Sequence, residues 1–227
     1  MIPRKFHRIW FGSRPRPAKY DEYWQAWQDL HPDAEFFTWT EDNLPELVNA
    51  AAYKAVAFTA KAGAVPMSKE RAVAVQRADI VAYELVYKFG GVYLNCDIMP
   101  LKPIDDLLHF SAFFGKEDEW HLCNAVMGAK PEHPLLGDVI KGLRKNLREV
   151  GDMGMERATG PQYLTKVYMA GVYNVEVLPQ SAFYPLHHAI IPHGQDYSEL
   201  GMRIAKEQDS YACHMWGHKT QEGILGA

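Results

Sequence analysis

Residues 89–100 read FGGVYLNCDIMP, and this stretch decides the fold of the 227-residue chain. A helical segment runs into two glycines, a short apolar strand follows, and the strand ends in Asn95-Cys96-Asp97. Ligands of open α/β sheets bind outside the carboxyl ends of the strands, so Asp97 is expected at the rim where a ligand would lie. A carboxylate at that rim suits a hard divalent cation and the phosphates that the cation carries.

The sequence on either side of this stretch predicts alternating strands and helices. Ser68 is expected to cap a long helix that ends at Gly90, and Thr40 is expected to cap a helix through residue 50. The predicted strands are 5–11, 35–39, 92–95, 111–115, 122–128 and 175–178, and the other predicted helices are 17–30, 103–108, 134–150 and 161–170. Residues 51–66 fit a helix or a lid-like loop, and the chain is expected to be irregular from Ser181 onward. The alternation favours an α/β fold with a mostly parallel central sheet flanked by helices, in one domain spanning 1–227.

The composition is that of an ordinary globular protein. Apolar residues make up 48% and charged residues 23%, and the net charge of −4 disfavours a nucleic-acid partner, which usually needs a basic surface. The three cysteines, Cys96, Cys123 and Cys213, are far apart and are interpreted as reduced thiols. The sequence has no signal-peptide-like apolar run and no stretch long enough to span a bilayer, so we expect a cytoplasmic location.

Several motifs together resemble the glycosyltransferase family that carries a DXD sugar-binding region. The stronger matches are IPRKFHRIWFG (2–12), ADIVAYEL (78–85), residues 89–100 and LKPI (101–104); weaker ones are NA (124–125), TGP (159–161) and YACHMW (211–216). Relatives in that family include mannosyl- and galactosyl-type transferases and the glucosylating domains of large clostridial toxins. The resemblance covers nearly the whole chain, and it implies a GT-A fold and metal-assisted transfer of a hexose from a nucleotide sugar.

The resemblance also implies the site. Asp97 would be the essential acid and a metal ligand, and Asn95 stands where the motif has its first aspartate, so both are predicted catalytic residues. The donor-binding residues that it implies are Trp10, Ile9, Asp79, Tyr83, Asn95, Asn124 and Trp216. Trp10 would stack on the base, and Asp79 would lie near the ribose or the sugar. Ala82 is a second departure from the pattern, because the family commonly has an arginine there.

Each of these residues also has a purely structural interpretation. Asp97 could cap the turn after its strand, Trp10 could be a core residue, and Asp79 could pair with Arg77 or Lys88. Asn124 could simply satisfy backbone groups within a strand. Thr159 is interpreted mainly as a helix cap.

A metal cofactor, Mn²⁺ or Mg²⁺, would neutralise the departing diphosphate. His214 and His218 are candidate ligands beside Asp97, and an imidazole ligand would favour Mn²⁺ over Mg²⁺. A lysine or arginine could also steady the diphosphate. Trp216 would pack over the phosphate or the sugar when the C-terminal segment closes.

We therefore expect transfer from a nucleotide sugar, with a UDP-sugar as first choice and a GDP-sugar as second, and with retention of configuration. The acceptor is left open among a glycan, a lipid-linked glycan, a small molecule and a protein side chain. The alternative is a degenerate nucleotide-sugar-binding protein without activity, which the departures at Asn95 and Ala82 motivate. A metal-dependent phosphoesterase is disfavoured, because such sites gather several carboxylates around two metals and only Asp97 is well placed.

Overall fold

The computed structural model describes residues 1–60, 68–150, 153–191 and 197–217. Its strands are β1 (Lys5–Ile9), β2 (Glu35–Trp39), β3 (Gly91–Leu94), β4 (Ile98–Pro100), β5 (Ala112–Lys116), β6 (Leu122–Ala129), β7 (Glu176–Leu178) and β8 (Ala212–His214). Its helices are α1 (Ala18–Leu30), α2 (Ala50–Thr59), α3 (Lys69–Phe89), α4 (Pro134–Val150), α5 (Met155–Ala158), α6 (Pro161–Met169) and α7 (Ser198–Glu207). Short 3₁₀ turns cover Asp105–Leu107, Gln180–Ala182 and His188–Ile190.

The main sheet has the order β2-β1-β3-β6-β5-β7. β1 is parallel to both β2 and β3, β6 is antiparallel to β3 and β5, and β7 is parallel to β5. Within this sheet, as far as the described residues go, only β6 opposes the other strands. The expectation of a mostly parallel sheet is confirmed.

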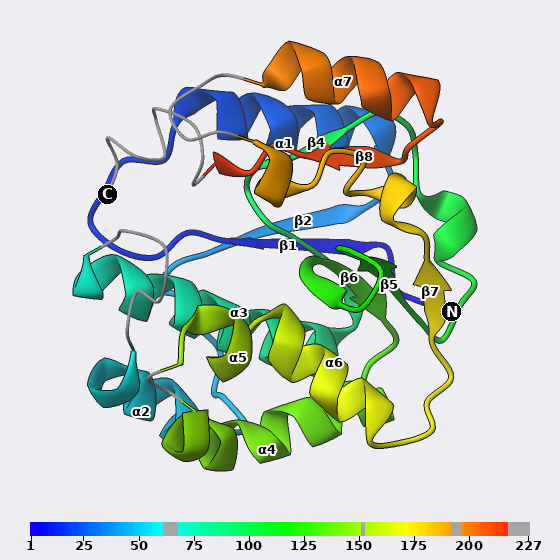
Figure 1. The fold of residues 1–227 in the computed structure, drawn as a ribbon. Helices are drawn as coiled ribbons and strands as arrows, with labels where there is room; N and C mark the ends of the chain where they lie inside the picture. The colour runs from blue at the N-terminus through cyan, green and yellow to red at the C-terminus, as the bar shows by residue number, and fades with distance from the viewer. Residues whose placement is uncertain (61–67, 151–152, 192–196, 218–227) are drawn as a thin grey trace.

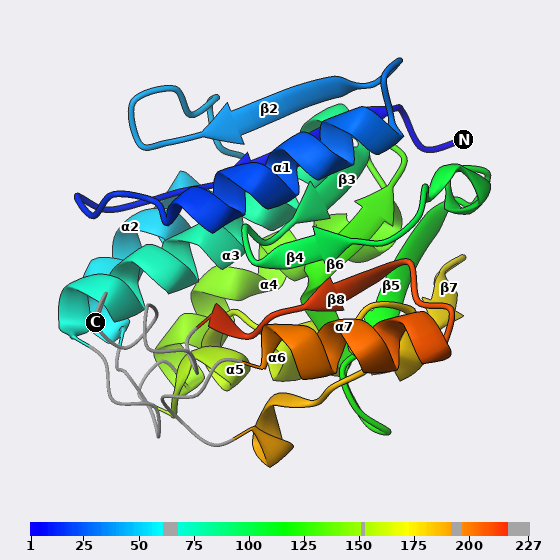
Figure 2. The same cartoon turned by 90° about the horizontal axis from the view of Figure 1, so that it is seen from above.

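Helices and a small second sheet cover the two faces of the main sheet (Figure 1). Helices α2 to α6 lie on one face, and α1, α7 and the antiparallel pair β4–β8 lie on the other (Figures 1 and 2). Each face has its own apolar core: α3 and α4 supply much of the first, and Trp24 and Trp27 of α1 belong to the second. The described helices include none that is both long and apolar enough to cross a bilayer.

Helix α3 and strand β3 join as the sequence predicts. The Ser68 side chain accepts a hydrogen bond from the backbone N–H of Arg71, and Gly90 ends the helix with a φ of 65°. Gly91 follows with a φ of 99°, and an added Cβ there would collide with the carbonyl oxygen of Lys5 on β1. The two glycines therefore let β3 lie directly against β1, and Asp97 follows in the turn after β3.

The helix expected from Thr40 to residue 50 is wrong. The Asn43 side chain accepts a hydrogen bond from the Thr40 backbone and donates one to the carbonyl oxygen of Thr38, which makes a turn, and Pro45 has no N–H to continue a helix. Helix α2 begins only at Ala50. Its cap is Asn49, whose side chain accepts from the backbone N–H of Ala52 at 3.1 Å.

The expectation of an irregular chain after Ser181 is also wrong. Helix α7 and strand β8 both lie in this region. A strand of three residues can be recognised only from the strand with which it pairs. The partner of β8 is β4, which lies more than a hundred residues earlier in the chain. This pairing matters for the site, because it delivers the C-terminal part of the chain to Asp97.

Candidate active site

Asp97 and His214 lie side by side at one end of the small sheet. Asp97 directly precedes β4, and His214 is the last residue of β8. Residues 95–97 form a turn closed by the Ile98 N–H donating to the Asn95 carbonyl oxygen, and β4 then pairs Ile98 with His214 of β8. His214 Nε2 consequently lies 3.1 Å from Asp97 Oδ1. The backbone N–H of Gly217 donates to Asp97 Oδ2 at 2.8 Å, so both oxygens of the carboxylate are held in place.

This pair fits the two adjacent ligands of one divalent cation. Ligands about 2.1 Å from an octahedral cation and at right angles to each other are about 3 Å apart, which matches the measured 3.1 Å. His214 Nδ1 is buried and has no hydrogen-bond partner, whereas a metal-bound histidine usually donates its second N–H to an oriented acceptor. Within the described residues no third histidine, cysteine or carboxylate joins the pair. The protein ligands alone would therefore hold a cation weakly, and diphosphate oxygens would have to complete the site.

Trp216 packs directly against this pair. Its ring centroid is 3.9 Å from that of His214, and its indole N–H donates to the carbonyl oxygen of Leu186. Trp216 is only 4% exposed and has a φ of 47°, a conformation that a bulky residue adopts only when its surroundings impose it. The structure thus packs the Trp216 ring against the ring of His214. The predicted contact of Trp216 with phosphate or sugar stays a prediction.

A second group of residues lies on the side where β1 ends. The Trp10 indole N–H donates to the carbonyl oxygen of Arg14 at 2.8 Å, and the Trp10 ring centroid is 6.2 Å from that of Tyr20. Gly217 lies so close to Tyr20 that an added Cβ would meet the Tyr20 hydroxyl and also contact Asp97 Oδ2. Trp10 and Asp97 therefore border one region through Tyr20 and Gly217, two residues that are not among the predicted site residues.

Arg71, from the first turn of α3, also faces this region. Burial and repulsion from Arg14 lower the pKa of the Arg71 guanidinium, and the nearby Tyr20 and Asp97 oppose that shift. An arginine near the carboxylate could neutralise a diphosphate. Arg77, by contrast, lies over the ring of Tyr53 and not beside the candidate cation site.

Asp79, on α3, forms a second polar cluster. Burial raises the pKa of Tyr93, and the charges of Asp79 and Asp97 both add to that rise, so both carboxylates lie near this tyrosine. The Asp79 carboxylate accepts hydrogen bonds from Asn124 at 2.8 Å and from the Thr159 hydroxyl at 2.7 Å. Burial raises the pKa of Asp79 to about 6, although both hydrogen bonds oppose the rise. Tyr83 is fully buried and donates to the Thr159 carbonyl oxygen at 2.8 Å, so it supports this cluster from beneath.

The structure thus brings the predicted donor residues Asp79 and Asn124 together. It replaces the suggested pairing of Asp79 with Arg77 or Lys88 by contacts with Thr159 and Asn124. The Thr159 hydroxyl binds Asp79, and no side chain caps α6, so the prediction of Thr159 as a helix cap is wrong.

The remaining predicted residues lie near the end of β3. Tyr93 donates to Asn95 Oδ1 at 3.0 Å, which fixes the orientation of the Asn95 amide. Ile9 is buried, and its carbonyl oxygen accepts from the Cys96 thiol, whose pKa burial raises to about 12. His218 lies outside the described residues.

The comparisons with known proteins find glycosyltransferases. The family model described as "Glycosyltransferase sugar-binding region containing DXD motif" matches residues 17–114. Inositol phosphoceramide mannosyltransferase 3 of Schizosaccharomyces pombe is 27% identical over 238 residues, which cover 99% of this chain and 62% of that protein.

Two solved structures have a similar fold. The PaToxG glycosyltransferase gives a TM-score of 0.58 at 14% identity, over 74% of this chain and 69% of that one. The UDP-bound glycosyltransferase domain from the YGT toxin gives a TM-score of 0.54 at 10% identity, over 78% and 79% of the two chains.

The chain is thus similar to glycosyltransferases with a DXD sugar-binding region. Its fold is the GT-A fold, as the resemblance implied. The chain spans about three fifths of the length of its fission-yeast relative, which is a longer protein. The position of the DXD motif holds Asn-Cys-Asp here, and the structure places its last acid, Asp97, beside His214.

Proposed function

We propose that this chain transfers a hexose from a nucleoside diphosphate sugar to a hydroxyl group of an acceptor. The observation that carries the proposal is the distance of 3.1 Å between Asp97 Oδ1 and His214 Nε2, at the rim where the strands of a GT-A fold end. A UDP-sugar is the first donor to test, and a GDP-sugar is the second because the named yeast relative is a mannosyltransferase.

The residues of the chain divide the work by position. Asp97 and His214 would hold Mn²⁺ or Mg²⁺, and such a cation, when bound, stabilises the negative charge that develops on the departing diphosphate. Arg71 would bind the same diphosphate, Trp10 would stack on the base, and Asp79 with Asn124 would accept and donate hydrogen bonds to the sugar. We expect the transfer to retain the configuration of the sugar without a nucleophile from the protein, so we assign that role to no residue.

Asp97→Asn tests the proposal, because it removes the charge and keeps the shape of the side chain. We expect Mn²⁺-dependent release of nucleoside diphosphate from UDP-glucose, UDP-N-acetylglucosamine or GDP-mannose to fall at least about a hundredfold. Asp42→Asn, at an exposed carboxylate, is the matched control and should leave the release unchanged. Equal release from wild type and Asp97→Asn would refute the proposal.

The alternative is a nucleotide-sugar binder without activity, which the departures at Asn95 and Ala82 favour. In that case nucleotide and Mn²⁺ would raise the melting temperature of the wild type together, but no donor would be turned over. The same panel of donors therefore separates the two candidates, since binding and release are measured on one sample.

A further inference from the structure

Glu117 is a buried carboxylate that the donor site does not use. It follows the last residue of β5, and its backbone N–H donates to the His121 carbonyl oxygen at 2.8 Å, so a hairpin fixes its position. Alternate residues of a strand face the same side, so Glu117 faces the same side as Gly115, whose added Cβ would meet Phe183 and Tyr184. Glu117 is 9% exposed and therefore turns into the molecule.

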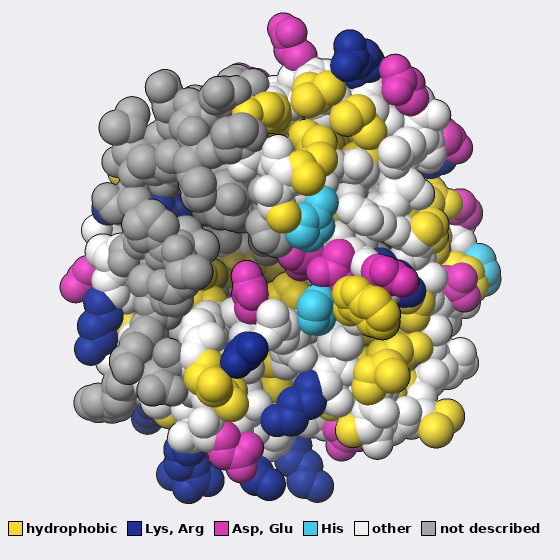
Figure 3. All heavy atoms as spheres, in the orientation of Figure 1, with side chains coloured by type: hydrophobic (Ala, Val, Ile, Leu, Met, Phe, Trp, Pro, Cys, Tyr) yellow, Lys and Arg dark blue, Asp and Glu magenta, His cyan; other side chains and the backbone are white. Residues whose placement is uncertain are grey.

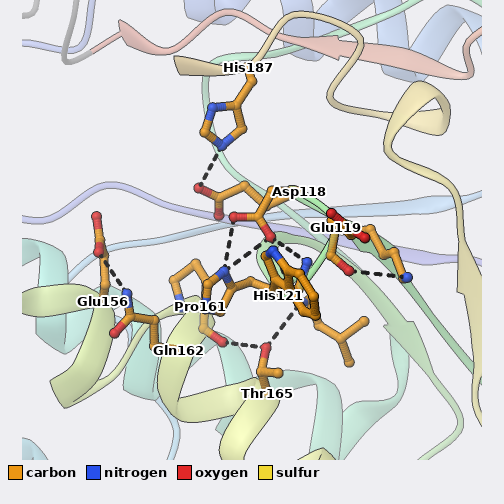
Figure 4. Close-up of polar contacts among 12 residues, drawn as sticks. Asp118, Glu119, His121, Glu156, Pro161, Gln162, Thr165 and His187 are labelled. Atoms are coloured by element: carbon orange, nitrogen blue, oxygen red, sulfur yellow. Dashed lines mark hydrogen bonds and ion pairs between the residues drawn. The ribbon is translucent and has the colours of Figure 1, made fainter. Parts of the chain in front are cut away.

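A row of contacts links Glu117 to the candidate cation site. Glu117 Oε1 lies 3.9 Å from His187 Nε2, and the His187 ring centroid is 6.1 Å from that of Trp216. Trp216 in turn packs on His214, which contacts Asp97. Glu117 thus lies on the same face of the sheet as the cation site, beyond Trp216. Figure 4 shows His187 reaching toward the hairpin from the opposite side.

The three carboxylates of the hairpin differ in their surroundings. Asp118 accepts hydrogen bonds from the backbone N–H groups of Trp120 and His121 and contacts the His121 ring. Glu119 is exposed. Burial and the nearby Glu117 raise the pKa of the Cys123 thiol, so Glu117 lies beside Cys123 as well as 3.9 Å from His187 Nε2. Figure 3 shows acidic and histidine side chains gathered at the middle of this face of the molecule.

We propose that Glu117, supported by His187, binds the hydroxyl groups of the acceptor, and that the acceptor is an uncharged sugar or polyol ring. This inference rests on the proposed transferase function. A buried carboxylate beside an imidazole accepts strong hydrogen bonds from hydroxyl groups. The negative charge of the buried Glu117 would repel an acceptor that carries a phosphate near the reacting hydroxyl.

The transfer itself balances without a further reactant. The acceptor oxygen forms a bond to C1 of the donor sugar as the bond from C1 to the diphosphate oxygen breaks, and the electron pair leaves with the diphosphate. The acceptor proton passes to the diphosphate. Glu117 accepts hydrogen bonds from the acceptor and takes up no proton.

Glu117→Gln separates binding of the acceptor from binding of the donor. Release of nucleoside diphosphate is measured with Mn²⁺, first with water as the only acceptor and then with methyl α-D-mannopyranoside, methyl β-D-galactopyranoside, myo-inositol or myo-inositol 1-phosphate. We expect at least one neutral compound, but not the phosphate, to stimulate the wild type. The variant should keep the release into water within about twofold and show at least a tenfold higher acceptor KM. Glu119→Gln, at the exposed neighbour, should match the wild type.

Three results would overturn the inference. The first is an unchanged acceptor KM in Glu117→Gln. The second is stimulation of the wild type by the phosphate alone, or by no compound of the panel. The third is a loss of release into water as large as the loss of release with acceptor, which would assign Glu117 to the donor site or the fold. Glu117→Asp and a melting curve distinguish this role from a folding defect. The shorter carboxylate should also raise the acceptor KM, and the melting temperature of the variant should equal that of the wild type. Failure of the proposed function is distinct: the wild type would then release no nucleotide at all.

Discussion

The charge on Asp79 should make the stability of the fold depend on pH. Burial raises its pKa from an ordinary value of 3.8 to about 6, so between these values the folded chain holds a proton that the unfolded chain has released. The contribution of Asp79 to stability is therefore greatest at low pH and is lost as the pH rises through 6. Asp79→Asn removes this dependence. Relative to the variant, the wild type should lose about 1 kcal/mol of unfolding free energy between pH 5 and pH 7, measured by urea denaturation.

The matched control for this experiment is Asp33→Asn, which changes a solvent-exposed aspartate. Its stability should follow the wild-type pH curve. If Asp79→Asn and the wild type gave parallel curves from pH 5 to pH 7, the carboxylate would titrate normally and the polar cluster with Thr159 would have to be revised.

Individual site residues differ in how far the sequence could predict them. The position of Asp97 beyond the end of β3 was predictable because a glycine pair and an apolar strand precede it. His214 was suggested beside Asp97 only because it lies in a recognisable C-terminal motif, and the structure shows the two in contact. The contact between Thr159 and Asp79 was not, because 80 residues separate them and only the packing of α3 against α5 brings them together. Glu117 gave no signal either, since an acidic run is ordinary on a solvated hairpin.

Between elements, the close approach of β3 to β1 should be the most sensitive point. Gly91 and Gly12 both have a positive φ, 99° and 92°, so alanine strains the backbone by about 1–3 kcal/mol at either position. Only at Gly91 does the added Cβ also collide with Lys5, which should cost about 1–3 kcal/mol more. Gly91→Ala should therefore lower the melting temperature clearly more than Gly12→Ala. Equal melting temperatures would mean that β1 and β3 can separate without cost.

Elements with strong local signals were predicted well. Helix α4 was predicted at the bounds that the structure gives it, because its apolar stripe repeats over four turns. The helix expected after Thr40 failed because a short polar turn at Asn43 and a proline outweighed the pattern. Strand β8 failed for the opposite reason: three residues carry no periodicity, and the pairing with β4 that makes them a strand is not local.

For the molecule as a whole, the candidate cation site depends on the small β4–β8 sheet. Asp97 comes from the middle of the sequence and His214 from near its end, and only this pairing brings them to 3.1 Å. The pairing also carries Trp216 and Gly217 into place behind and beside the carboxylate. Binding of nucleotide with a cation should therefore stabilise the docking of the C-terminal segment against the sheet, because ligand binding stabilises the state that forms the site.

A double-mutant cycle on Asp97→Asn and His214→Gln tests this coupling. With Mn²⁺ and UDP present together, the wild type should melt several degrees higher, and each single variant should lose most of that shift. Because both residues would hold one cation, the double variant should lose no more than the single variants do. Mn²⁺ alone should shift the wild type little, since the described protein ligands number only two. His109→Gln, at an exposed histidine, should keep the full shift. Additive losses from the two substitutions would mean that Asp97 and His214 act on separate ligands, and the single cation site drawn from their geometry would then be wrong.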